Sequence, residues 1–472
     1  MTKAFEESLT LFKDKISDCI KSKKSISITT HIDCDGLTSG SIIAKALIRE
    51  GAKYTLRTSK EFSKNVVESF KTDSRDFHIV TDLGGGFGKD LNQTLGDNWI
   101  ILDHHQISEE EKDNQNIINS WKYGIDGGSE ICAGGMAYFA AMALDEKNSD
   151  LSEIAVVSAL GDRQDQGERK SFTGKNFEIS NTAKELGLVE IDLDLLLVGR
   201  ETRPLAEALA FTSQPFIEGL TWNKETCLSV LNSSGIQLKE EGRWRVPAEL
   251  NEDEKKAVIE SITKFSSDKN TSEIMSELIG YTYTFPKEDK RSFLRDGREY
   301  STMLNSCGRI NRSGVGMAIC MGDRNRILTE GENILTDYRK MIKEYMNILS
   351  NERWRISENE NLGIYYLEFD IEALDEEIKN ANSSEVDDVA PISDNLDGIF
   401  SDMDDVSNIE DSAITGELDD LGALMSEVDA VKIPVDEVTE SDFACHGCCV
   451  IPRAVFEAIE GEREDIIRGL DP

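Results

Sequence analysis

Short apolar segments rich in β-branched residues alternate with longer amphipathic segments along the first 190 residues. Four of the short segments have the length and composition of strands: Ser25–Thr30, Tyr54–Thr58, Phe77–Leu83 and Asn98–Asp103. Between and after them, apolar residues recur at helical spacing, as in Thr38–Arg49 and Met136–Leu144. Strands that alternate with helices form a parallel sheet with helices on both faces, so we predict an α/β domain over residues 1–190.

The remainder of the chain is organised differently. Residues 191–290 are polar with helical periodicity, which predicts a mainly helical connector. In residues 291–472, a dense block of small and apolar residues at 300–322 precedes a long amphipathic segment, Thr329–Ser357, whose first residues have the spacing of a capping box. A last helix is predicted at Ala454–Gly469. A chain of 472 residues is therefore expected to hold more than one domain.

Acidic residues outnumber basic ones by 90 to 52, which gives a formal net charge of −38. Residues 381–440 contribute a net −17 of this charge, because they contain eighteen acidic residues and one lysine, Lys432. Phosphate binding relies on Lys and Arg, so the charge does not predict a nucleic-acid-binding surface. Any function on nucleic acid must therefore be argued from a site.

Membrane insertion and disulfide bonding are both disfavoured by the sequence. No apolar run approaches the ~20 residues that a membrane-spanning helix needs, and the N-terminus lacks a signal-peptide core. The nine cysteines are scattered, and several lie in apolar or motif segments, as buried thiols do in a reducing compartment. We expect a cytoplasmic protein with no membrane span and no disulfides.

Carboxylate and imidazole side chains directly follow four of the apolar segments. They are His31, Asp33 and Asp35; Asp82; Asp103, His104 and His105; and, after Ile154–Leu160, Asp162 and Asp165. The carboxyl ends of parallel strands meet at one edge of a sheet, where ligands bind. Oxygen ligands with a few imidazoles suit Mn²⁺ or Mg²⁺ better than Zn²⁺. The pattern therefore predicts a site for two divalent ions, which together can activate a water molecule.

Two neighbouring ions need a carboxylate that bridges them. Asp82, which stands alone at the end of its strand, is the bridging candidate. The other ligands are expected to form one pair for each ion, His31 with Asp33 and Asp35 with His104. Either Asp162 or Asp165 completes the second set, and the positions of the residues leave both open.

Asp103 and His105 are the predicted catalytic residues. His105 lies beside the ion ligands, where it can contact a substrate phosphate or a leaving oxygen. The glycines Gly84–Gly86 would allow the backbone to approach a phosphate closely. His78 lies within a strand and is expected to be a packed imidazole. Each motif alone is commonly a turn, but three of only five histidines lie in two of the motifs, so the joint pattern favours a metal site.

The four motifs resemble, in order, those of the DHH phosphoesterase superfamily. The matching residues are His31-x-Asp33-x-Asp35-Gly36, Asp82, Asp103-His104-His105 and Gly161-x3-Asp165. The spacing of the family's fourth motif selects Asp165 rather than Asp162 as the ligand. The resemblance implies an N-terminal parallel-sheet DHH domain that hydrolyses phosphoesters with two metal ions.

A second block resembles the phosphate-binding motif of the DHH-associated domain. Its candidate substrate-binding residues are Asn305, Gly308, Arg309 and Arg312. The resemblance implies that residues 291–472 form a smaller α/β DHH-associated domain whose arginines contact substrate phosphate, a role that suits the guanidinium group. With the glycine-rich segment Asp126–Gly135, this block makes the chain most similar to the archaeal RecJ-like nucleases.

Two features depart from the pattern of that family. The family carries a Gly-Gly-His near its C-terminus, whereas the corresponding stretch here, Phe443–Pro452, contains only His446. Either His446 takes the place of the family's Gly-Gly-His near the active site, or that contact is lost. The acidic segment 381–440 is either a folded, acidic version of the family's subdomain, a partner-binding insertion or a solvated segment.

The motifs and the resemblance together predict a metal-dependent phosphodiesterase, an exonuclease that releases mononucleotides from single-stranded DNA or RNA. One alternative is a phosphodiesterase of short oligonucleotides or cyclic dinucleotides, because the metal motifs cannot distinguish substrate length. The other alternative is a replication scaffold that binds helicase subunits. Superfamily members with that role have lost the metal ligands, so their retention here disfavours a purely structural function.

Overall fold

The computed structural model describes residues 3–266, 271–351, 356–359 and 364–367. The acidic segment 381–440, the stretch around His446 and the helix predicted at Ala454–Gly469 lie outside these residues. The chain divides into two compact units, one of residues 1–211 with 228–338 and one of residues 212–227 with 339–472. All the candidate ligands belong to the first unit.

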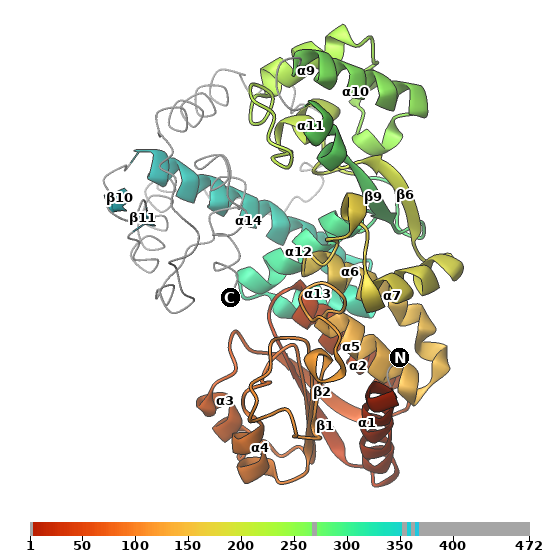
Figure 1. Ribbon diagram of the computed structural model, residues 1–472, viewed down its shortest axis with the longest axis vertical. Helices are drawn as coiled ribbons and strands as arrows, with labels where there is room; N and C mark the ends of the chain where they lie inside the picture. Colours follow the sequence, from red (N-terminus) through yellow and green to blue (C-terminus); the bar gives the residue numbers. More distant parts are fainter. Residues whose placement is uncertain (1–2, 267–270, 352–355, 360–363, 368–472) are drawn as a thin grey trace, which may run out of the picture. The chain divides into compact units, whose positions relative to one another are not determined.

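A five-stranded parallel sheet organises the first unit (Figure 1). Its strands are β1 (Ser25–Thr30), β2 (Lys53–Thr58), β3 (Phe77–Thr81), β4 (Trp99–Asp103) and β5 (Ile117–Asn119), in the order β2-β1-β3-β4-β5. The predicted parallel α/β sheet is confirmed, and the four predicted strands differ from the observed ones by at most two residues at an end. The sequence analysis missed β5, because three residues are too few to establish an alternating pattern.

The register of the sheet aligns the ends of the strands that carry the motifs. Thr30 pairs with Thr81, and Thr81 pairs with Leu102. The residues that follow these positions are therefore neighbours at the carboxyl edge, although they are far apart in the sequence. Parallel pairing of the strands is thus sufficient to bring the first three motifs together.

Helices cover both faces of the sheet. On one face, α1 (Lys3–Lys21), α2 (Cys34–Arg49) and α5 (Ala133–Leu144) enclose the larger apolar core with strand residues such as Ile26 and Ile79. On the other face, α3 (Lys64–Ser69) and α4 (Gly88–Leu95) enclose a smaller core. The burial of these apolar side chains stabilises the sheet. The same packing holds the first residues of α2 and α5 next to the carboxyl edge.

Several further helices of the first unit lie outside the predicted connector. They are η1 (Ser120–Tyr123), η2 (Glu146–Leu151), α6 (Ser152–Gly161), η3 (Glu168–Lys170), α7 (Gly174–Glu185), α12 (Gly297–Arg309) and α13 (Ser313–Met321). Helix α12 contacts α2 and α6, and α13 contacts α2. The block predicted to begin a separate domain at residue 291 therefore packs within the same compact unit as the sheet. Its apolar face, which includes Met303, Leu304 and Cys307, is buried in the core of that unit.

The predicted helical connector is bounded by two antiparallel strands that the sequence analysis missed, β6 (Glu190–Leu195) and β9 (Ile279–Thr284). Between them lie α8 (Leu205–Ala210), α9 (Lys224–Ser233), β7 (Lys239–Glu240), β8 (Arg243–Trp244), η4 (Pro247–Glu249), α10 (Glu252–Phe265) and α11 (Thr271–Leu278). The alternation of acidic and apolar residues in β6 was the available strand signal.

Helix α14 (Arg326–Asn351) begins three residues before the predicted start, and the strands β10 (Ile356–Asn359) and β11 (Ile364–Leu367) form an antiparallel pair after it. The six cysteines among the described residues are buried free thiols. In the same part of the chain, no helix is long and apolar enough to cross a membrane.

Candidate metal centre

The first motif forms the turn between β1 and α2. Asp33 is the N-cap of α2, and its Oδ1 accepts a hydrogen bond from the Gly36 backbone N–H at 2.9 Å. Its Oδ2 lies 2.8 Å from Nδ1 of His31. A side chain at Gly36 would clash with the backbone of His31, so the tight turn requires glycine. The residue types of this motif thus place three candidate ligands at the start of a helix.

Asp35 lies in the first turn of α2 and is anchored by a second helix. Its carboxylate accepts hydrogen bonds from the backbone N–H groups of Ala133 and Gly134, each at 2.8 Å, in the first turn of α5. The hydroxyl of Ser158, in α6, donates a further hydrogen bond to it. These three hydrogen bonds fix the orientation of the carboxylate at the start of α5.

Asp82 follows β3 and occupies an unfavourable position. Its backbone has φ +61°, in the left-handed region that non-glycine residues rarely adopt, and its Oδ2 is buried without a hydrogen-bond partner. This oxygen lies 3.6 Å from Nδ1 of His31, and the Oδ1 lies 3.4 Å from Nε2 of His104. Burial raises the pKa of Asp82 to about 6, and the carboxylates of Asp33 and Asp35 add to the effect. A bound cation would give this oxygen a partner and would reduce the repulsion among the three carboxylates. The site therefore fits a metal.

His104 is oriented by the backbone of the glycine-rich segment. Its Nδ1 lies 2.7 Å from the carbonyl oxygen of Gly127, which can only accept a hydrogen bond. In the neutral imidazole, Nδ1 therefore carries the proton and Nε2 keeps its lone pair. Nε2 lies 3.3 Å from Oδ2 of Asp35 and also faces Asp82. This is the tautomer that a metal ligand requires.

The candidate ligand atoms form three overlapping groups, within each of which they lie no more than 4.8 Å apart. The groups are His31 with Asp33 and Asp82; Asp82 with His104 and His105; and Asp35 with His104 and Asp162. Asp82 belongs to two groups, and its two oxygens face different histidines. The structure therefore brings together the residues predicted for the two ions, except at the fourth motif.

The fourth motif contributes Asp162 to these groups, and not Asp165 as the resemblance implies. Helix α6 ends at Gly161, so Asp162 lies at the helix end with its Oδ2 3.7 Å from Nδ1 of His104. Burial raises the pKa of Asp162 to about 8, with the nearby carboxylates adding to the effect. Asp165 instead accepts a hydrogen bond from the guanidinium of Arg298, in α12, at 2.6 Å. The direction of the chain after α6 therefore brings Asp162 close to His104 and pairs Asp165 with Arg298.

Asp103 lies outside the three groups and behind His105. Its Oδ1 lies 2.8 Å from Nδ1 of His105, and it also accepts a hydrogen bond from the backbone N–H of His104 at 2.8 Å. The Gly85 N–H donates to its other oxygen at 3.2 Å, and a Cβ there would lie 2.8 Å from the same oxygen. Asp103 is therefore placed as a positioning residue for His105, and Gly85 makes room for Asp103.

Two family models match parts of this chain. The family model described as "DHH family, N-terminal domain" matches residues 25–161, which contain the first three motifs and end one residue before Asp162. The model described as "DHH-CID domain" matches residues 197–279, between β6 and β9. Two segments of the chain, residues 25–161 and 197–279, therefore match domains of the DHH family.

The chain is also similar to individual proteins. The uncharacterized protein MJ0831 of Methanocaldococcus jannaschii is 29% identical over 369 residues, which span 75% of this chain and 77% of the relative. The structure of CDC45 from Entamoeba histolytica has the same fold, with a TM-score of 0.52, 17% identity and 73% of each chain covered. RecJ from Thermus thermophilus in complex with Mn²⁺ has a TM-score of 0.41 and 14% identity, over 73% of this chain and 40% of RecJ.

The predicted substrate-binding residues lie on α12 and at the start of α13. Asn305 Oδ1 accepts a hydrogen bond from the Cys34 backbone N–H at 2.8 Å, at the first residue of α2. A side chain at Gly308 would clash with the backbone of Ile32, so this glycine permits close packing on the first motif. Arg309 and Arg312 are exposed, and Arg312 forms an ion pair with Glu330. Asn305 and Gly308 therefore support the first motif, whereas Arg309 remains open to a ligand.

Gln164 is a site residue that the sequence analysis missed. Its side chain is fully buried, and its Nε2 lies 2.7 Å from the Gly127 carbonyl, 2.7 Å from Asp162 Oδ2 and 3.2 Å from the Ile131 carbonyl. Its Oε1 accepts a hydrogen bond at 2.6 Å from the buried Asn176, in α7. One amide thus orients both Asp162 and the carbonyl that selects the tautomer of His104. A glutamine between two aspartates has no distinctive sequence pattern, and only the packing of α6 against α7 reveals its role.

Proposed function

We propose that this DHH-family phosphoesterase is a metal-dependent exonuclease that hydrolyses single-stranded DNA or RNA from an end. The observation that carries the proposal is the buried, unpartnered Oδ2 of Asp82, which lies among candidate ligands from the first and third motifs. A carboxylate oxygen that is buried without a partner is unfavourable, and a cation beside it removes the penalty. The arrangement therefore supports a role in metal binding in preference to a structural role.

The donor set supports Mn²⁺ or Mg²⁺ as the metal. His31, Asp33 and Asp82 would hold one ion, and Asp35, His104 and Asp162 would hold a second. The Oδ1 of Asp82 also faces His104 of the second set. Four carboxylates and two imidazoles form a mainly oxygen set, which Mn²⁺ accepts more readily than a thiolate-preferring metal does. Two such ions, when bound, lower the pKa of water and neutralise charge on phosphate oxygens.

The protein's own groups would supply proton transfer and substrate orientation. Because Asp103 occupies Nδ1 of His105, the opposite nitrogen, Nε2, can donate a proton to the leaving oxygen. The imidazole is 55% exposed, so a substrate can reach it. Burial lowers the pKa of His105, but the hydrogen bond with Asp103 and the charges of Asp103 and Asp82 together raise it to about 9, which favours the proton-donating form. We assign Arg309, the exposed arginine of α12, to phosphate contact.

The proposal is tested by digesting 5′- and 3′-labelled single-stranded DNA and RNA with Mn²⁺ or Mg²⁺. We expect mononucleotides from one end of linear strands, no cleavage of circular single strands, and loss of activity in Asp82→Asn with the fold retained. Cleavage of circles would show an endonuclease, and cleavage confined to dinucleotides or cyclic dinucleotides would show a small-substrate phosphodiesterase. No metal-dependent cleavage of any of these substrates would contradict the proposal and leave a binding function.

A further inference from the structure

Trp121 stands at the edge of the sheet that carries the candidate metal centre. It lies in η1, which directly follows the carboxyl end of β5, the strand that pairs with β4. Its side chain is 36% exposed, although large aromatic side chains are usually more deeply buried. Neither the metal ligands nor the proton donor described above accounts for an exposed indole at this place.

The indole is held against the DHH motif by hydrogen bonds. Its Nε1–H donates to the backbone carbonyl of His104 at 2.8 Å. Its backbone N–H donates to Oδ1 of Asn119 at 3.1 Å, and the Asn119 amide donates to the backbone carbonyl of His105 at 2.9 Å. The ring therefore lies directly beside the two histidines of the motif, with its polar edge turned toward their backbone.

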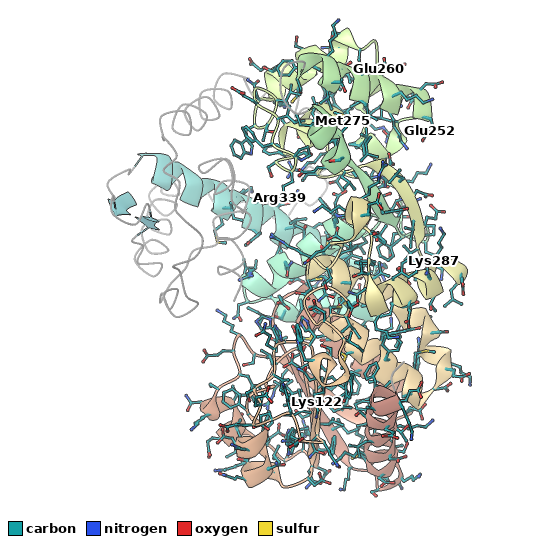
Figure 2. All side chains as sticks on the ribbon, viewed as in Figure 1. Lys122, Glu252, Glu260, Met275, Lys287 and Arg339 are labelled. Atoms are coloured by element: carbon teal, nitrogen blue, oxygen red, sulfur yellow. The ribbon has the colours of Figure 1, made fainter. Side chains whose placement is uncertain are left out.

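The neighbouring residue keeps this turn rigid. Lys122, labelled in Figure 2, donates hydrogen bonds from its ammonium group to the carbonyls of Asn114 at 2.7 Å and Ile117 at 2.8 Å. An indole that is fixed in advance loses little conformational entropy when a planar ligand stacks on it. Since Nε1 already has its hydrogen-bond partner, the exposed part of the ring has apolar contact to offer.

The charge of the chain gives this contact added importance. Proteins that bind single strands combine cationic contacts to phosphates with aromatic side chains on which bases stack. In this protein acidic residues outnumber basic ones by 90 to 52, so its overall charge does not favour the first kind of contact. Stacking does not depend on charge and tolerates any base, so it suits an acidic enzyme that acts on strands of varied sequence.

We propose that Trp121 is a nucleobase platform, on which a base adjacent to the scissile phosphate stacks while the phosphate lies at the metal centre. This inference rests on the proposed function and specifies the part of the substrate that the enzyme recognises. It assigns to the substrate an unpaired base, in addition to a phosphodiester, as a feature required for tight binding.

Two variants separate stacking from support of the DHH backbone. Trp121→Phe keeps an aromatic face but cannot donate to His104, whereas Trp121→Gln keeps an N–H donor but has no ring. Base–aromatic stacking predicts that Trp121→Gln raises KM for a single-stranded oligonucleotide roughly 5- to 150-fold, with kcat changed less, and that Trp121→Phe stays close to wild type. A large loss of kcat in Trp121→Phe with wild-type KM in Trp121→Gln would overturn the proposal, because the hydrogen bond to His104 would then be what matters.

A matched control is Trp244→Gln, because Trp244 is a 40% exposed tryptophan in β8, outside the described site. It should leave KM unchanged. A second comparison uses oligonucleotides with abasic terminal residues, which wild type should bind less tightly than normal strands and Trp121→Gln should not distinguish.

The failure of this inference can be told apart from the failure of the proposed function. If wild type cleaves normal and abasic strands with equal KM and Trp121→Gln matches it, the exonuclease remains and the platform is refuted. If wild type cleaves no strand, fluorescence anisotropy with a labelled single strand and Mn²⁺ still decides the point. Weaker binding by Trp121→Gln than by Trp121→Phe supports the platform, and equal binding refutes it.

Discussion

Replacing Gln164 with methionine tests whether its buried amide organises the candidate metal centre. Methionine has a similar volume but makes none of the amide's hydrogen bonds. The Gly127 carbonyl keeps a donor, Nδ1 of His104, and the Asp162 side chain is 32% exposed, so water can replace the lost N–H there. The amide of Asn176, whose residue is 1% exposed, loses its acceptor. This orphaned donor is the largest loss.

The magnitude follows from these unequal losses. A buried donor left without a partner costs about 1–3 kcal/mol, and the weaker losses at Asp162 and Gly127 bring the expected decrease in the free energy of unfolding to about 2–4 kcal/mol. Asn176→Leu should cost less, because the Oδ1 of Asn176 already lacks a hydrogen-bond partner. The double variant removes both members of the pair, so its loss should fall short of the sum of the single losses by about 1–2 kcal/mol.

Urea denaturation with EDTA present, followed by far-UV circular dichroism, gives the three free energies. Isothermal titration with Mn²⁺ then measures the functional effect, where Gln164→Met should weaken binding at least about 10-fold, the effect typical of residues that orient metal ligands. If the loss of the double variant equals the sum of the two single losses to within about 0.5 kcal/mol, the coupling between Gln164 and Asn176 is refuted. Unchanged Mn²⁺ affinity in Gln164→Met would refute the role assigned to Gln164.

Three further predictions concern the ligands and their setting. Asp162→Asn should bind Mn²⁺ less tightly in calorimetry, whereas Asp165→Asn should keep its affinity. The free energy of unfolding of Asp165→Asn should fall by about 1–3 kcal/mol, because Arg298 loses a charged hydrogen bond. The reverse result would restore Asp165 as the ligand. Gly127→Ala should lower both Mn²⁺ affinity and the melting temperature, since the added methyl group clashes with the His104 backbone, whereas Gly86→Ala, with open space around it, should change neither. Mn²⁺ at 100 times its Kd should stabilise wild type by about 2.7 kcal/mol for each ion bound, which EDTA reverses and Asp82→Asn abolishes. Equal shifts in that variant would place the ions elsewhere.

The sequence by itself determined which elements form and which residues stand at their ends. Apolar, β-branched segments of strand length predicted β1, β3 and β4, and parallel pairing then places the residues that follow them, His31, Asp82 and His104, at one edge. This inference needs only the periodicity of each segment, which is local, and the general geometry of parallel sheets. For the same reason it failed for β5, whose three residues are too short to show a pattern.

The tertiary structure alone decided how distant helices complete the site. The direction of the chain beyond α6 brings Asp162 to His104 and sends Asp165 to Arg298. The packing of α12 on α2 turns Asn305 toward the backbone of the first motif. The sequence alone had predicted that Asn305 contacts substrate. Such contacts depend on the orientation of whole helices and on side chains hundreds of residues apart, and neither the spacing of motifs nor the propensity of a segment encodes them.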